Sequence, residues 1–89
     1  MRAIVTVIGK DRVGIIAAVA NLLSEHGVNV LDISQTVLQG YFNMIMLVDA
    51  SACTIPFAEL ANTLSAAGED MNLQIRAKRE EVFNAMHRI

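Results

Sequence analysis

The chain has 89 residues, enough for one hydrophobic core and too few for two. Hydrophobic residues make up 54% of it and charged residues 18%, which excludes a disordered or low-complexity segment. The formal net charge of −2 gives no general attraction to nucleic acid or to an anionic membrane surface, so neither is an expected partner. No run reaches the length of about 18 apolar residues that a membrane span needs. The protein is therefore predicted to be cytoplasmic.

Cysteine and histidine are too sparse for a disulfide or a structural zinc site. Cys53 is the single cysteine, so it has no intrachain partner. His26 and His87 stand far apart, whereas zinc needs several ligands at close spacing. Neither a metal nor a cofactor is expected.

A strand and a helix open the chain. Residues 3–8 are β-branched and apolar on both faces, which is typical of a central strand. The next apolar stripe has helical spacing from Gly14 to His26 and stops at Gly27, a residue that commonly ends helices.

Two strands joined by a tight turn follow. Residues 28–38 and 41–49 are rich in apolar side chains and meet at Gln39-Gly40, which favours a hairpin. The second of these strands is apolar on both faces. The first strand, residues 28–38, carries four polar residues in its central part, Asp32, Ser34, Gln35 and Thr36. They either line a pocket between subunits or mark a bulge in an exposed edge.

A second helix, a fourth strand and a terminal helix complete the pattern. Pro56, two residues after Thr54, predicts a helix start, and the apolar stripe that follows stops at Gly68. Residues 71–78 alternate between apolar and polar, so this strand has one buried and one solvated face. Residues 80–89 predict a short amphipathic helix that packs on the domain or on a dimer partner.

The predicted order is βαββαβ followed by a helix. In about 80 residues this order is the plan of a ferredoxin-like α+β sandwich, with two helices on one face of a four-stranded antiparallel sheet. The other face is apolar and uncovered, so the terminal helix or a second copy of the chain has to cover it. A homodimer is expected.

This fold hosts unrelated functions, so function has to be argued from sites. An RNA-binding version needs aromatic residues on the central strands, and residues 3–8 have none. A metal carrier needs two cysteines in the first loop. An acylphosphatase-like hydrolase needs an arginine and a side-chain amide, roles open to Arg12 and Asn43, but the loop lacks the glycine-rich pattern. Without a nucleophile beside a base, a non-enzymatic domain is predicted; a purely structural dimerisation module remains an alternative.

The best candidate binding site is the segment between the first strand and the first helix, Gly9-Lys10-Asp11-Arg12-Val13-Gly14-Ile15. A short turn there places backbone N–H groups and a helix N-terminus at one edge of the sheet, where a small anionic group binds well. A structural role is also open for three of the residues. Asp11 is a preferred helix cap, Gly14 permits close packing of helix on sheet, and Asn29 is a common turn residue.

This loop, the helix after it and Gly27-Val28-Asn29-Val30 at the start of the second strand together resemble the ACT domain. The resemblance covers residues 2–79, and residues 1–79 are taken as one ACT-like domain. ACT domains are amino-acid-sensing regulatory modules in which a small ligand typically binds between two copies. The chain is also similar to small stand-alone bacterial proteins with a single ACT domain and no assigned function, which share the stretch from Asp32 to Val37. It is more distantly similar to the ACT halves of the glycine cleavage system repressor.

The resemblance implies a particular set of site residues. Gly14 corresponds to the family's loop glycine, Asp11 to a position whose carboxylate receives an amino group, and Asn29 to a strand residue that reaches a ligand on the partner subunit. Val13 stands where many members have Pro, and Gly9 where some have His. The predicted ligand-binding residues are Asp11, Arg12, Val13, Gly14, Ile15 and Asn29. The implied function is a regulatory domain that binds an amino acid at a homodimer interface and acts on a protein partner.

Overall fold

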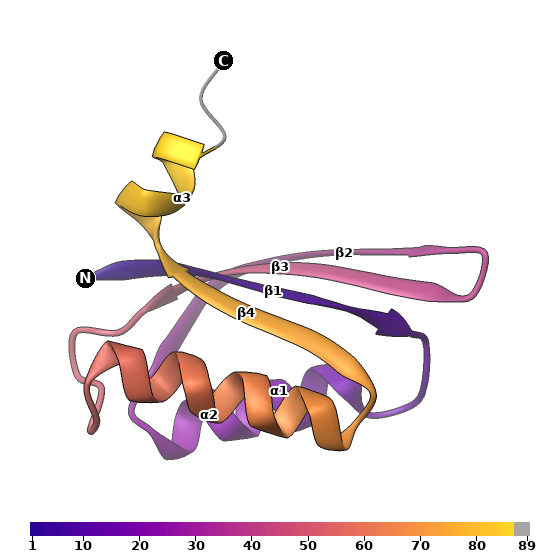
Figure 1. The fold of residues 1–89 in the computed structure, drawn as a ribbon, viewed down its shortest axis with the longest axis horizontal. Helices are drawn as coiled ribbons and strands as arrows, with labels where there is room; N and C mark the ends of the chain where they lie inside the picture. Colours follow the sequence, from indigo (N-terminus) through magenta and orange to yellow (C-terminus); the bar gives the residue numbers. More distant parts are fainter. Residues whose placement is uncertain (87–89) are drawn as a thin grey trace.

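A computed structural model of the chain describes residues 1–86, so the last three residues of the predicted terminal helix lie outside the described part. The elements are β1 (Arg2–Lys10), α1 (Ile15–Glu25), β2 (Asn29–Leu38), β3 (Tyr41–Asp49), α2 (Phe57–Asp70), β4 (Leu73–Arg79) and α3 (Glu80–Met86). The strand order is β2-β3-β1-β4 with every neighbouring pair antiparallel. The predicted ferredoxin-like plan is confirmed. Figure 1 shows α1 and α2 on one side of the sheet and α3 rising from the other.

The hydrophobic core lies between the sheet and the two long helices. Successive side chains of a strand point to opposite faces, so each central strand sends every second residue into the core. The buried residues of β1 and β3 are Ala3, Val5, Val7, Phe42, Met44, Met46 and Val48. The helices meet them with Ile15, Val19, Leu23, Leu60 and Leu64. The core therefore uses one face of the sheet, as the alternation predicts.

The second helix is longer than the sequence predicts. It does not stop at Gly68 but continues to Asp70, and the chain turns at Asn72, which has a positive φ of 57°. Gly68 is buried inside the helix, where an added Cβ would lie 2.8 Å from the carbonyl oxygen of Leu73. This glycine thus marks a close approach of α2 to β4, not a helix end.

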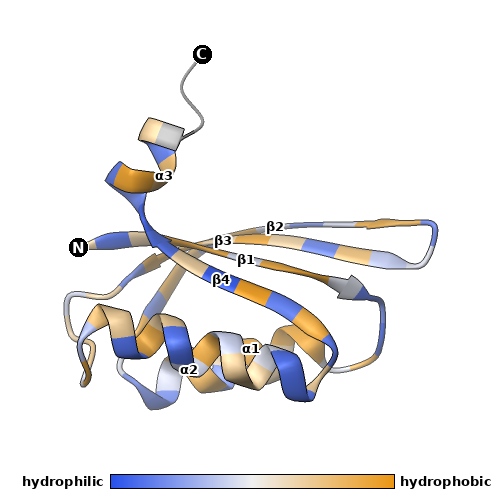
Figure 2. Ribbon diagram, viewed as in Figure 1, coloured by the Kyte–Doolittle hydropathy of each residue, from blue (hydrophilic) through white to orange (hydrophobic). Residues whose placement is uncertain are grey.

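The β2–β3 hairpin projects beyond the helices. Gln39 and Gly40 form its turn with φ of 50° and 81°, the positive values that a tight two-residue hairpin turn needs. Every residue of β2 except Val30 is exposed, and the β2–β3 register shifts between Val30 and Asp32, as expected for a bulge in an exposed edge. Figure 2 shows hydrophobic residues continuing into the part of the hairpin that no helix covers.

The short helix α3 contacts β1 and β4 and stands away from the sheet (Figure 1). Arg2 holds its first turn: Nε donates to Glu80 Oε2 at 2.7 Å, and Nη2 lies 2.6 Å from the same oxygen. Val82 on this helix is 45% exposed. Within one chain, α3 therefore leaves most of the sheet face beneath it uncovered.

Candidate functional site

The β1–α1 loop begins after Lys10 and ends at Gly14, which caps α1 with a φ of 90°. No side chain caps this helix, so the interpretation of Asp11 as the helix cap is wrong. Asp11 instead donates its backbone N–H to the carbonyl oxygen of Gly40 at 2.8 Å, which ties the loop to the hairpin turn. Its exposed carboxylate is consequently not used by the helix.

Gly14 is required by backbone conformation and not by crowding. A Cβ placed on it would meet no atom within 4 Å, so close packing of helix on sheet does not explain this glycine. Its left-handed φ does, because only glycine adopts that region without strain. The space beside Gly14 is open, and a ligand atom can approach the backbone there.

A cavity of about 260 Å³ lies between the start of α1 and the hairpin; we call it the loop cavity. The loop and helix contribute Asp11, Arg12, Gly14, Ile15, Ile16 and Ala17, and the hairpin contributes Gln35 and Phe42. A second hollow of about 400 Å³ lies on the other side of the loop, against Met71 and Asn72. Asp11 and Arg12 line both hollows and therefore form the ridge between them.

Four of the six predicted site residues line the loop cavity, and two do not. Val13 is 100% exposed and lines neither hollow. Asn29 pairs with Asp49, which pairs with Arg2 at the start of β1, whereas the loop follows Lys10 at the other end. The eight steps along β1 at about 3.3 Å each separate Asn29 from the loop by about 26 Å. Asn29 therefore does not complete the loop cavity of its own chain.

Two residues of the hairpin join the site without having been predicted there. Gln35 belongs to the polar stretch of β2, but its position beside α1 follows only from the sheet order. Phe42 has the pattern of a core residue, and it is 5% exposed where it borders the cavity. Gln35 lies in the stretch from Asp32 to Val37 that carries the resemblance, whereas no motif marks Phe42. Both residues reach the loop through the antiparallel pairing of β3 with β1, and Gln35 also through the pairing of β2 with β3.

The loop cavity combines opposite charges with an apolar wall. Arg12 and the N-terminus of α1 attract an anionic group, and Asp11 attracts a cationic one. Ile15, Ile16 and Phe42 supply the apolar side. Such a site suits a small zwitterion with an apolar substituent.

Arg12 and Asn43, the pair considered for phosphoryl chemistry, are not brought into one cavity. Arg12 lines the two hollows at the loop, and Asn43 lines neither. Asn43 lies between the buried Phe42 and Met44 on β3, so it faces the side of the sheet away from α1. The arrangement that an acylphosphatase-like reaction needs is not formed by these two residues.

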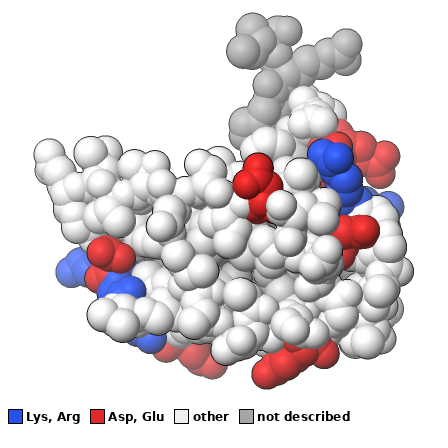
Figure 3. Space-filling view, turned by 180° about the vertical axis from the view of Figure 1, so that it is seen from behind, with Lys and Arg blue, Asp and Glu red and all other residues white. Residues whose placement is uncertain are grey.

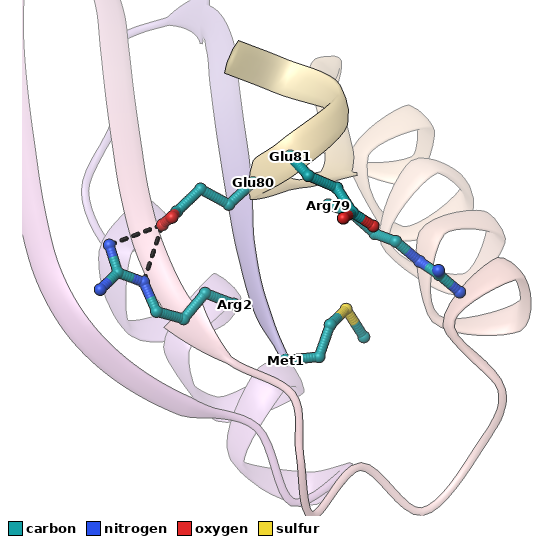
Figure 4. A pocket seen from close by; sticks show the side chains of 5 residues that line it. All are labelled: Met1, Arg2, Arg79, Glu80 and Glu81. Atoms are coloured by element: carbon teal, nitrogen blue, oxygen red, sulfur yellow. Dashed lines mark hydrogen bonds and ion pairs between the residues drawn. The ribbon is translucent and has the colours of Figure 1, made fainter. Parts of the chain in front are cut away.

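A third hollow, of about 430 Å³, lies at the opposite end of the sheet beside α3. Figure 4 shows its five residues, Met1, Arg2, Arg79, Glu80 and Glu81, with Arg2 bound to Glu80. The Arg79 guanidinium lies 5.9 Å from the centre of the Phe57 ring. Both guanidinium groups thus have partners within the chain.

Within residues 1–86 no three His, Cys, Asp or Glu side chains gather to hold a metal ion, and no helix is long and apolar enough to cross a membrane.

The fold is that of a small ferredoxin-like domain with a cavity beside its first loop. The family model of the ACT domain matches residues 2–78. A UPF0237 protein of Listeria monocytogenes is 51% identical over 89 residues, covering 100% of both chains. A UPF0237 protein of the archaeon Methanocaldococcus jannaschii is 47% identical over 88 residues, covering 99% of this chain and 98% of its own. The chain belongs to the ACT domain family, and its relatives occur in archaea as well as in bacteria.

Solved structures agree with this assignment. An ACT domain protein from Streptococcus pneumoniae superimposes with a TM-score of 0.82 at 41% identity, over 93% of each chain. A putative glycine cleavage system transcriptional repressor has a TM-score of 0.74 at 24% identity, over 86% of this chain and 44% of its own. The second likeness concerns the fold alone.

Proposed function

We propose that this protein is a non-enzymatic regulatory domain that binds a free amino acid at the loop cavity, between two copies of the chain, and acts on a protein partner. The observation that carries the proposal is the loop cavity itself, where an acid, a base and a helix N-terminus surround an apolar wall. Membership of the ACT family supports a regulatory role.

The charges of the loop fit the two ends of an amino acid. Its carboxylate binds at the start of α1 beside Arg12, and its ammonium group binds Asp11. The side chain lies toward Ile16 and Phe42, which favours an apolar residue type. The cavity volume of about 260 Å³ admits a ligand of this size.

A second copy has to supply Asn29 if this residue takes part. Because Asn29 lies about 26 Å from the loop of its own chain, only another copy brings its amide near a bound ligand. Binding between copies would then couple ligand concentration to assembly, and assembly to the surface offered to a protein partner.

A thermal-shift screen against the twenty amino acids tests the proposal. A ligand at about 100 times its Kd stabilises the folded state by about 2.7 kcal/mol, which raises the Tm of a domain of this size by roughly 10 to 20 °C. We expect one or a few apolar amino acids to give such a shift. The Asp11→Asn variant should lose the shift, and Glu59→Gln, an exposed carboxylate change on α2, should keep it.

The same screen tests separately whether an amino acid binds at the loop cavity and whether it binds between two copies. If no amino acid raises the Tm, or if Asp11→Asn shifts as the parent does, the loop cavity is not an amino-acid site. Asn29→Ala should leave the Tm without ligand unchanged, because Asn29 is exposed, and should reduce the ligand-induced shift. A full shift in Asn29→Ala would contradict binding between copies.

A further inference from the structure

The sheet face away from α1 and α2, which we call the open face, carries apolar side chains in solvent. Ile8, Tyr41 and Ile45 on the two central strands are 48%, 54% and 50% exposed. Four strands about 4.8 Å apart and about 30 Å long give this face an area of about 570 Å², and α3 adds a wall at one end. A stable interface buries about 800 Å² on each partner, so the open face with α3 has the size of one such side.

The strand register sets the open-face side chains in rows that cross the sheet. One row runs Asp32, Leu47, Ile4, Lys78 from the β2 edge to the β4 edge. It has an acid at one end, a base at the other and two apolar residues between them. The next row runs Ser34, Ile45, Thr6, Arg76. The β4 edge is thus basic, and the β2 edge is polar to acidic.

We propose that two copies of this chain pack open face against open face about a twofold axis nearly parallel to the strands. Such an axis reverses the strand order in the second copy and keeps each row at the same position along the strand direction. It places Asp32 over Lys78 of the second copy, and Leu47 over its Ile4. A twofold interface requires a surface that is complementary to itself, and these rows have that property. An unrelated partner would not require self-complementary rows. The rows therefore favour a second copy of the chain as the partner that covers the open face.

The helix α3 fits this arrangement as a side wall. Its seven residues rise about 10 Å, which equals the spacing of about 10 Å between packed sheets. Figure 1 shows it rising at the end of β4, so in the pair it stands beside the β2 edge of the other copy. Val82 and Leu31, which are 45% and 48% exposed, then lie at the same end of the interface.

The surface charges are consistent with this arrangement. In the view from behind, Figure 3 shows the projecting hairpin as an uncharged lobe. Charged residues gather at the loop below it and around the base of α3 on the opposite side. Along β1 and β3 the charged residues, Arg2, Lys10 and Asp49, stand at the strand ends, so the middle of the open face carries no charge and the charges lie at its rim, as in stable protein interfaces.

The open-face interface is separate from the contact between copies that is proposed at the loop cavity, and it does not rest on that proposal. An axis along the strands keeps every residue at its own end of the sheet, so Asn29 of the second copy stays about 26 Å from the loop. Disrupting the open face should therefore reduce the assembly without emptying the loop cavity.

Light scattering on the full chain tests the interface. Ile45→Asp sets an unpaired carboxylate in the apolar centre and should weaken the pairing by about 100-fold or more, nearly halving the measured mass at about ten times the wild-type dissociation constant. Ala66→Asp, on the exposed outer side of α2, is the matched control and should keep the wild-type mass. An unchanged mass for Ile45→Asp across the dilution series would overturn the proposal.

Charge reversal of the pair that faces across the interface gives an independent test. Asp32→Lys and Lys78→Asp should each weaken the pairing by about 10-fold, because each brings like charges together where Asp32 lies over Lys78 of the second copy. The double variant should return to within a few-fold of wild type. A double variant weaker than either single one would contradict the orientation, and this result holds even if Ile45→Asp fails to fold. A thermal shift with an amino acid in Lys78→Asp reports the loop cavity separately.

Discussion

Several single residues have roles that depend on what lies beside them in the fold. Gly27 ends α1 with a φ of 74°, and a Cβ there would lie 2.5 Å from the carbonyl oxygen of Ala52. Nearby, Thr54 donates its backbone N–H to the carbonyl oxygen of His26 at 2.9 Å. The end of α1 is thus pinned by the loop that follows β3, and glycine is needed for both conformation and space.

Asp49 at the end of β3 is held by two donors from Ser51. The Ser51 hydroxyl donates to Oδ1 at 2.6 Å, and the Ser51 backbone N–H donates to the same atom at 2.9 Å. The amino terminus lies 3.5 Å from this oxygen. These hydrogen bonds, the hydroxyl first, hold the pKa of Asp49 below its ordinary value of 3.8.

Stability should depend on pH through Asp49. Because the folded state favours the ionised carboxylate, its contribution is complete above about pH 3.8 and is lost as the pH falls through the lower pKa of the folded state. Urea unfolding of wild type and Asp49→Asn should differ most near pH 6 and least near pH 2.5. When Ser51→Ala is added to both proteins, the difference in their free energies of unfolding near pH 6 should become smaller. An equal gap at both pH values would contradict this role of the carboxylate.

At the scale of elements, α2 and β4 pack more closely than their sequences indicate. Gly68 lies within α2, and an added Cβ would meet both the Leu73 carbonyl oxygen at 2.8 Å and Ile75 Cγ1 at 2.9 Å. Glycine costs a helix interior about 1 kcal/mol relative to alanine. The close packing against β4 explains why the helix keeps this residue.

Gly68→Ala should therefore destabilise the protein although alanine favours helices. The gain of about 1 kcal/mol in helix propensity is outweighed by an overpacking cost of up to about 3 kcal/mol, because a backbone atom is in the way. Ser65→Ala, at an exposed position of the same helix, should be neutral or stabilise by about 0.5 kcal/mol. Chemical denaturation measures both. A stabilised Gly68→Ala would mean that α2 and β4 separate easily.

At the scale of the whole molecule, α3 stands outside the core. The core cluster takes its buried residues from β1, β3 and β4, from α1 and α2 and from the segments joining the elements, and none from residues 80–85 of α3. Arg2 and Glu80 form an exposed ion pair that links α3 to the domain. Exposed pairs contribute about 1 kcal/mol or less.

A chain that ends at Arg79 should accordingly fold cooperatively, with a loss of about 1 kcal/mol or less in its free energy of unfolding. Its assembly should weaken, because α3 forms a wall of the proposed open-face interface. Urea unfolding and light scattering on the same sample separate the two effects. A loss of several kcal/mol would instead assign α3 to the stability of the single domain.

The local pattern of the sequence determined the order of elements and the composition of the core. The apolar runs of β1 and β3, the alternation in β4 and the helical spacing in α1 and α2 are properties of neighbouring residues, so they can be recognised without tertiary information. The hairpin turn at Gln39-Gly40 was equally local, since it depends on positive φ at two adjacent positions. The loop from Asp11 to Ile15 was recognisable as a site because it joins a strand to a helix.

Only the tertiary structure decided what each of these residues contacts. Gly68 has the pattern of a helix end, and the approach of β4 made it an interior residue. Asp11 has the pattern of a helix cap, but Gly14 takes the cap position and the backbone N–H of Asp11 bonds to Gly40 in the hairpin turn instead. Sheet register brought Gln35 and Phe42 to the loop and carried Asn29 to the far end. Contacts between residues distant in sequence depend on strand order and register, which no local pattern encodes.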